Sequence, residues 1–361
     1  MTRLTIFMER LKDKGLELLP ALLKDVLESR IELIQACLSQ IYGLSKYLKN
    51  NMGVEGYRTL IDHITPFLTE LVDHEEPDIR DMARSKLGEI ADLMTEADRS
   101  NYVLKVCLEL VQEQQKDQNK IAGLKLLGQL SGLFQKEFLQ GFVVTQLTAL
   151  SHDPNDNVRV VTVEQMAKIC AYIDTEIVTR KFGPEFKRLS MDQNWQVRLN
   201  FVEKLVTLAE HIPVDKRNLY LGDILLTLLN DKTRWVKEAA LQQLGHFLAI
   251  LDHKNKNDKL FEEYLKIPKS IAKLNKEPQN KICFSVAETL PKIIEAQGES
   301  TWKPLSGLYK LLLEKDEEVK ILLAKNIHAL SKCLTKSENK NQLLNVMKKE
   351  FLSNNVKGKP F

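Results

Sequence analysis

Apolar and polar positions recur at a fixed step along three successive segments of the chain, which begin at Thr145, Pro184 and Asp223. In each segment a Leu is followed by an Asp, then by a Val and a basic residue. The equivalent positions are Leu150, Leu189 and Leu228; Asp153, Asp192 and Asp231; Val158, Val197 and Val236; and Arg159, Arg198 and Lys237. Each set advances by the same number of residues, about 40, which is typical of repeat proteins.

Each segment predicts two helices joined by a polar turn. An amphipathic helix ends near the Leu, and the Asp opens the turn. The second helix begins near the Val and carries apolar residues four and eight positions later, such as Ala240 and Leu244, which share one helix face. A two-helix unit of about 40 residues is the HEAT pattern, so we predict an all-α HEAT-repeat solenoid.

Weaker copies of the unit extend the array in both directions. Ile79-Arg80 and Val319-Lys320 occupy the Val-basic position, whereas the copy at 102–134 has the helices but lacks the Arg. Because each unit buries its apolar face only against its neighbours, we predict one continuous array over residues 1–340. Its expected repeats are 16–50, 58–97, 100–137, 140–178, 180–214, 217–252, 260–297 and 301–336, followed by a C-terminal helix and basic tail at 341–361. A polar loop is expected at 251–264.

Composition narrows the classes of partner. The chain has 52 basic and 49 acidic residues and a net charge of +3, so its charge favours neither a nucleic acid nor a membrane as partner. No run of about 18 apolar residues predicts a transmembrane helix. Five scattered Cys form no C-x-x-C pair and are typical of reduced thiols, which predicts a cytoplasmic or nuclear protein.

Sequence signatures of catalysis are not found. The seven His are isolated, without an H-E-x-x-H motif or a His–Cys metal-ligand spacing. The phosphate-binding and nucleophile motifs G-x-x-x-x-G-K-[ST], G-x-G-x-x-G and G-x-S-x-G are also missing. We therefore predict that the chain is not an enzyme and holds no cofactor or metal.

The turns between paired helices carry the candidate functional residues. The Asp side chains are expected to accept hydrogen bonds from amides that start the second helix, and Arg198 to bridge to an Asp of an adjacent repeat. Trp195 and Trp235 differ in repeat position, so they either cover a neighbouring helix start or anchor a partner. The predicted partner-binding residues are Arg80, Asn157, Arg159, Trp195, Arg198, Arg234, Trp235 and Lys237, and the structural ladder is Asp153, Asp192 and Asp231.

Several units resemble a known family. "NWQVRLNFVEKL", "ARSKLGEIADLM" and "LLNDKTRWVKEAALQQLGHFLAIL" look like units of the protein phosphatase 2A scaffold subunit and, more closely, of phosphatase 4 regulatory subunit 1. The resemblance covers about residues 60–335, whereas both families have longer solenoids. It implies a non-catalytic scaffold that binds a Ser/Thr phosphatase catalytic subunit, with further regulatory subunits or substrates as additional partners.

Two other functions stay open at the level of sequence. The first is a different HEAT adaptor, related to transport or translation. The second is a HEAT-like nucleic-acid-binding protein or DNA glycosylase, which the near-neutral charge disfavours. Recovery of a phosphatase catalytic subunit with the native protein would distinguish the phosphatase scaffold from both.

Overall fold

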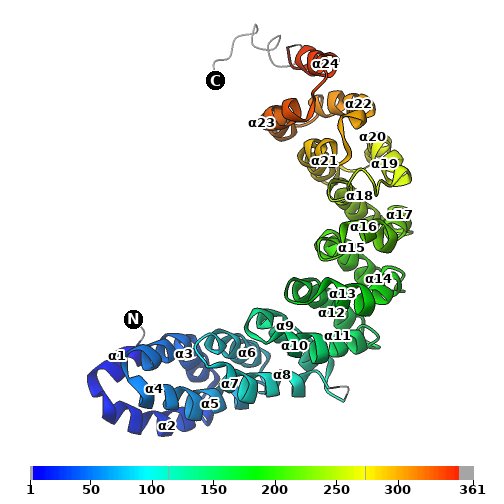
Figure 1. Ribbon diagram of the computed structural model, residues 1–361. Helices are drawn as coiled ribbons and strands as arrows, with labels where there is room; N and C mark the ends of the chain where they lie inside the picture. The colour runs from blue at the N-terminus through cyan, green and yellow to red at the C-terminus, as the bar shows by residue number, and fades with distance from the viewer. Residues whose placement is uncertain (1–2, 113, 273, 349–361) are drawn as a thin grey trace. The chain divides into compact units, whose positions relative to one another are not determined.

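The computed structural model describes residues 3–112, 114–272 and 274–348, and these form helices and no strands (Figure 1). The all-α class and the HEAT-type solenoid predicted from the sequence are confirmed. The chain divides into two compact units, Met1–Ile173 and Asp174–Phe361. The predicted repeat boundaries and the continuity of the array stay predictions, and residues 349–361 of the predicted tail lie outside the described residues.

Unit 1 is built from helix pairs whose second helices α3, α6, α9 and α12 pack in series. Its elements are α1 Arg3–Leu11, α2 Asp13–Leu27, α3 Ile31–Asn51, α4 Gly53–Thr59, η1 Leu60–Ile64, α5 Thr65–Leu71, α6 Pro77–Ala91, α7 Glu96–Asp98, η2 Arg99–Leu104, α8 Lys105–Leu110, α9 Asp117–Gln129, η3 Ser131–Leu133, α10 Lys136–Phe138, η4 Leu139–Val143, α11 Val144–Leu150, α12 Asp156–Ile169 and η5 Cys170–Tyr172.

Unit 2 has the same construction, with α15, α18, α21 and α23 following one another along one side (Figure 1). Its elements are α13 Thr175–Ile177, η6 Val178–Phe182, α14 Gly183–Ser190, α15 Trp195–Glu210, α16 Val214–Arg217, η7 Asn218–Gly222, α17 Asp223–Leu229, α18 Arg234–Ala249, α19 Asp258–Leu265, α20 Ile267–Ile271, α21 Lys276–Gln297, η8 Glu299–Thr301, α22 Trp302–Leu313, α23 Glu317–Cys333 and α24 Ser337–Met347.

A π-helical turn interrupts the first helix of five successive helix pairs. These turns are η1, η2, η4, η6 and η7, and they recur in step with the repeat. A π turn inserts an extra residue into the helical hydrogen-bond pattern and bends the helix. The first helix of each of these pairs is therefore a chain of short segments, whereas the second helix is continuous.

The repeated apolar positions form the core between the helices. Val158, Val197 and Val236 are fully buried, as are Leu205 and Leu244. Two glycines bring neighbouring second helices close together: Gly128 and Gly245 each lie where an added Cβ would contact a side chain of the next repeat. The contacting residues are Gln165 and Thr289, so the space that a side chain would occupy is already filled.

Two local boundaries differ from the sequence prediction. The polar loop expected at 251–264 ends early, because α19 begins at Asp258, where the Asn257 side chain accepts a hydrogen bond from the amide of Leu260 at 3.0 Å. Such a cap satisfies a free amide at the helix start and fixes where the helix begins. The C-terminal helix, α24, begins at Ser337, ahead of the predicted 341.

Among the described residues, none of the helices combines the length and the apolar character that crossing a membrane requires.

Candidate functional site

Arg198 links two neighbouring repeats of unit 2 through a buried ion pair. Its Nε and Nη2 donate to the two carboxylate oxygens of Asp231 at 2.7 and 2.9 Å, and Nη2 also donates to the Thr233 hydroxyl at 3.2 Å. Its Nη1 donates to the carbonyls of Asp192 and Gln193 in its own turn, at 2.7 and 3.2 Å. One guanidinium thus holds the turn of its own repeat against the turn of the next.

The local electrostatics favour the charged forms of both partners. The hydrogen bonds to Asp231 raise the pKa of Arg198, against the opposing effect of burial. Burial acts to raise the pKa of Asp231, but the hydrogen bonds from Arg198 and the Thr233 amide outweigh it, and the pKa of this carboxyl lies below its usual value. Since a bidentate arginine–carboxylate pair is strong and geometrically specific, this contact fixes the relative position of the two turns.

Unit 1 contains a related contact that the sequence pattern missed. The copy at 102–134 lacks the Arg, as noted from the sequence, but Lys120 occupies that position and is buried. Its Nζ lies 2.8 Å from Oδ2 of Asp153 in the next repeat. Lys120 precedes Arg159 by the repeat step, so the periodicity held the signal, although the residue is a lysine rather than an arginine.

The repeated aspartates stabilise the turns rather than the second helices. In each of the three turns, Oδ1 of the Asp accepts a hydrogen bond from the backbone amide of the residue two positions later in the chain. The pairs are Asp153 with Asn155 and Asp192 with Asn194, both at 2.9 Å, and Asp231 with Thr233 at 2.7 Å. These amides lie before the helix start, which corrects the prediction. Capping of the helix itself falls to the side chains of Asn155 and Asn194.

The two tryptophans of unit 2 lie in the first turns of α15 and α18, which pack against each other. Trp195 is 38% exposed and Trp235 is 59% exposed. Lys237 is also exposed, and the exposed Arg234 pairs with Glu238 on its own helix. We call Trp195, Arg234, Trp235 and Lys237 the turn surface of unit 2. Trp302 differs, since it is buried and stacks edge-on against Tyr309, as expected for a packing residue.

The remaining predicted residues lie in unit 1 and mostly bind their own turns. Arg159 Nη1 donates to the carbonyls of Asp153 and Pro154, and Arg80 Nη1 donates to those of His74 and Glu75. The amide of Asn157 donates to Asn155, while its side chain is exposed. The arginines therefore have a structural role in the turns, and the turn surface of unit 2 offers the larger exposed rings.

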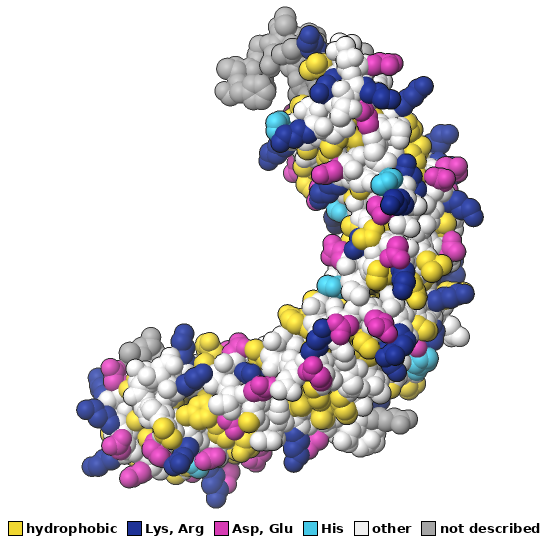
Figure 2. All heavy atoms as spheres, in the orientation of Figure 1, with side chains coloured by type: hydrophobic (Ala, Val, Ile, Leu, Met, Phe, Trp, Pro, Cys, Tyr) yellow, Lys and Arg dark blue, Asp and Glu magenta, His cyan; other side chains and the backbone are white. Residues whose placement is uncertain are grey.

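Neither a one-sign charged face nor a metal-binding cluster marks a site in the views and residues described. Acidic and basic side chains are mixed over the visible face of each unit (Figure 2). Across residues 3–112, 114–272 and 274–348, no cluster of three His, Cys, Asp or Glu could hold a metal ion. Burial raises the pKa of the Cys107 and Cys170 thiols to about 12, so these thiols stay protonated and unreactive at neutral pH.

The stacked helix pairs define a HEAT-type α-solenoid protein. A family model described as "Sister chromatid cohesion protein PDS5 protein" matches residues 58–353, and the chain belongs to this family. The chain is also 22% identical over 182 residues to human "Serine/threonine-protein phosphatase 4 regulatory subunit 4", and 21% identical over 264 residues to human "Serine/threonine-protein phosphatase 4 regulatory subunit 1". The resemblance to phosphatase regulatory subunits inferred from the sequence is confirmed.

These matches cover only part of the relatives. They include 50% and 58% of this chain but 21% and 27% of the two human proteins. Among solved structures, a chain from "Kap95p Binding Induces the Switch Loops of RanGDP" matches with a TM-score of 0.71 at 16% identity, over 98% of this chain and 47% of that one. A chain from Kap121p bound to Ste12p matches with a TM-score of 0.67 at 14% identity, over 97% and 36%. At such identities the structural likeness concerns the fold alone.

Proposed function

We propose that the chain is a non-catalytic regulatory subunit that binds a Ser/Thr protein phosphatase catalytic subunit of the phosphatase 4 or 2A type. The observation that carries this proposal is the pair of exposed tryptophans on neighbouring turns of unit 2. Exposed Trp beside basic residues is the composition of interface hot spots. The relationship to two phosphatase 4 regulatory subunits supports the choice of partner.

The turn surface of unit 2 is suited to binding because its support is rigid. Arg198 and Asp231 tie the turn that precedes Trp195 to the turn that precedes Trp235. A partner that meets both rings then encounters side chains whose backbone is already fixed, so less conformational entropy is lost on binding. Bound in this way, the chain would regulate the activity or the substrate choice of the phosphatase.

A second candidate is a HEAT adaptor that binds no phosphatase. The match to the PDS5 cohesion family and the fold likeness to Kap95p and Kap121p structures favour it. Both candidates use the solenoid as a binding surface, and they differ in the partner. Recovery of the native complex therefore distinguishes them.

The test begins with purification of the tagged chain from its own cells and identification of the bound proteins by mass spectrometry. We expect a phosphatase 4, 2A or 6 catalytic subunit in stoichiometric amount. Its absence from repeated purifications would overturn the phosphatase proposal in favour of the adaptor. Binding of the recovered catalytic subunit is then measured with the Trp195→Ala, Trp235→Ala double variant.

We expect the double variant to bind at least about 30-fold more weakly, since truncating a hot-spot tryptophan costs about 2 kcal/mol or more. Leu219→Ala is the matched control. Leu219 is 78% exposed and lies in η7, in the first helix of the repeat that carries Trp235, so it is not part of the turn surface. Equal affinities of the double variant and the wild type would show that the phosphatase binds elsewhere on the chain.

A further inference from the structure

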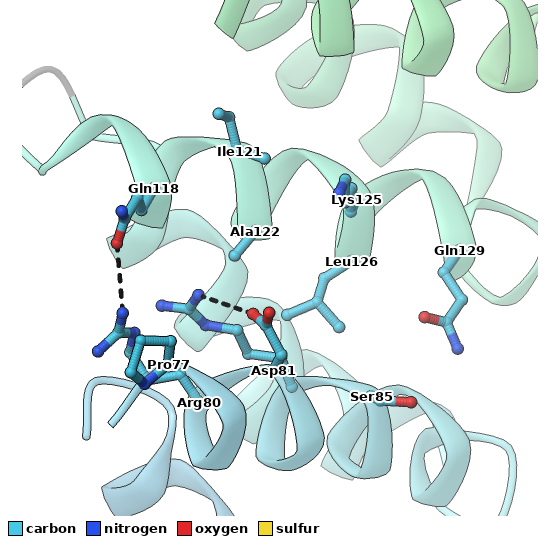
Figure 3. Close-up of a pocket in the computed structure, with 11 residues that line it drawn as sticks. Pro77, Arg80, Asp81, Ser85, Gln118, Ile121, Ala122, Lys125, Leu126 and Gln129 are labelled. Carbon is cyan, nitrogen blue, oxygen red and sulfur yellow. Dashed lines mark hydrogen bonds and ion pairs between the residues drawn. The ribbon is translucent and has the colours of Figure 1, made fainter. Parts of the chain in front are cut away.

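Unit 1 has an open groove between α6 and α9, with a volume of about 510 Å³. Figure 3 shows Ala122 and Leu126 pointing from α9 toward α6, where Pro77 and Asp81 lie. The groove lies on the second helices of two neighbouring repeats, apart from the turn surface of unit 2. It combines an apolar floor with several cationic side chains.

Arg84 lies in this groove with a guanidinium that is only partly compensated. The residue is 6% exposed, and its Nε has no hydrogen-bond acceptor among the described residues. Its Nη2 donates to Oδ1 of Asn119 at 2.8 Å, while its Nη1 lies 3.7 Å from Asp81, whose side chain is 82% exposed. A buried guanidinium whose nearest carboxylate is an exposed side chain 3.7 Å away is weakly compensated, so an anion held beside it in the groove would stabilise its charge.

Two further cations surround the same space. Arg80 is one helical turn before Arg84, and its Nη2 donates to Oε1 of Gln118 at 3.2 Å, which fixes it across the groove (Figure 3). Lys125 is exposed on α9 and also lines the groove. With Asp81 as the one acidic lining residue, three positive charges face one negative charge. Burial lowers the pKa of Arg84, and the neighbouring Arg80 adds to this effect, while the carboxylates of Asp81 and Asp73 oppose it.

We propose that the groove between α6 and α9 binds an acidic peptide segment of a partner protein, with an Asp or Glu carboxylate at Arg84 and an aliphatic side chain on Ala122 and Leu126. The planar guanidinium matches the geometry of a carboxylate. The groove is open to solvent rather than an enclosed cavity, which suits a segment of a partner protein better than a fully buried small molecule. This binding is independent of the phosphatase, which we assign to unit 2.

The experiment measures binding of the full chain to an array of octapeptides that combine Asp or Glu with Leu, Ile or Val. A matched array carries Asn or Gln in place of each acid, and a third carries phosphoserine. We expect a subset of the acidic peptides to bind, with at least about tenfold weaker binding of their amide counterparts and a loss of affinity as salt is raised.

Two variants test the assignment of the groove. Arg84→Gln removes the buried charge, and Lys125→Glu reverses an exposed charge without disturbing the core; each is expected to weaken the best acidic peptide about tenfold or more. Lys86→Gln is the matched control on α6, because Lys86 pairs with Glu89 and does not line the groove.

Three results would each overturn the proposal. The first is that no acidic peptide binds the wild type. The second is that the amide or phosphoserine peptides bind as well as the acidic ones or better. The third is that Lys125→Glu and Lys86→Gln have equal effects. Because Lys125→Glu leaves the buried residues in place, a loss of folding in Arg84→Gln does not remove the test.

Discussion

The contacts Lys120–Asp153 in unit 1 and Arg198–Asp231 in unit 2 occupy equivalent repeat positions, and both are buried. Lys120 reaches one carboxylate oxygen of the next repeat, at 2.8 Å. Arg198 reaches both carboxylate oxygens and the Thr233 hydroxyl, and it also binds two carbonyls of its own turn. The same position in the repeat therefore joins repeats in two different ways.

The difference follows from the chemistry of the two cations. Lysine ends in a compact charge, whereas arginine presents a planar fork that can bind a carboxylate and another acceptor at once. In unit 1 a second side chain shares the task, since Asn155 donates to Oδ2 of Asp117 in the preceding repeat at 2.7 Å. In unit 2 Arg198 alone binds both carboxylate oxygens of the next repeat and the carbonyls of its own turn, and it supports the turns that carry Trp195 and Trp235.

Removing Arg198 should lower the free energy of unfolding more than removing Lys120. Arg198→Ala leaves Asp231 buried without its partner, and we expect a loss of about 3–5 kcal/mol from the free energy of unfolding. Lys120→Ala should cost less, because the Asn155–Asp117 hydrogen bond still joins the same two repeats. Chemical denaturation measures the loss, and hydrogen exchange of α15 and α18 against α9 and α12 shows which unit opens.

Lys237→Ala provides the control for a basic residue at the equivalent position that is exposed. It should change the free energy of unfolding by no more than about 0.5 kcal/mol, as is usual for surface substitutions. A larger loss for Lys120→Ala than for Arg198→Ala would contradict the comparison. It would show that Lys120 contributes more to the stability of unit 1 than Arg198 contributes to that of unit 2.

Periodicity predicted the helix pairs, the buried valines and the possibility that Arg198 bridges to an Asp of a neighbouring repeat. It missed Lys120, because the copy at 102–134 was noted only for lacking the Arg, although Lys237 and Lys320 show that a lysine can fill this position. The π turns were also missed, since segments such as Leu60–Ile64 and Val178–Phe182 share no evident residue signature. A bend of this kind depends on how the first helix packs, which a single sequence does not display.

The candidate sites were predictable to different degrees. Trp195 and Trp302 are alike in sequence as tryptophans at helix starts, yet one is exposed and the other is buried. Exposure depends on whether a neighbouring repeat covers the ring, which only the assembled structure shows. The groove at Arg84 was not predicted at all, because an arginine on an amphipathic helix is usually solvated and its burial is a tertiary effect.

Replacing the arginine of the Arg198–Asp231 pair by a lysine, as in the Lys120–Asp153 pair, should lower the free energy of unfolding by an intermediate amount. Arg198→Lys keeps the positive charge near Asp231 but loses the second carboxylate bond and the bonds to the carbonyls of its own turn. We expect a loss of about 1–2 kcal/mol, the value of one or two net hydrogen bonds. The free energy of unfolding from urea titration measures it. A variant as stable as the wild type would show that the forked geometry of arginine contributes nothing beyond charge.

The smallest effect concerns pH. The pKa of Asp231 is lowered in the folded chain because the hydrogen bonds from Arg198 and the Thr233 amide outweigh the effect of burial, whereas an Asp in an unfolded chain titrates near about 3.9. Below that pH the unfolded chain binds a proton that the folded chain does not. The stability contributed by Asp231 is therefore complete above about pH 5 and declines as the pH falls through 4 toward the lowered folded pKa.

Urea titrations between pH 7 and pH 3 should show a shallower decline for Asp231→Asn, which is less stable at neutral pH but has no carboxyl to protonate at this position. If the two pH profiles are parallel, the carboxyl of Asp231 titrates alike in the folded and unfolded chains, and the electrostatic description of this link is wrong.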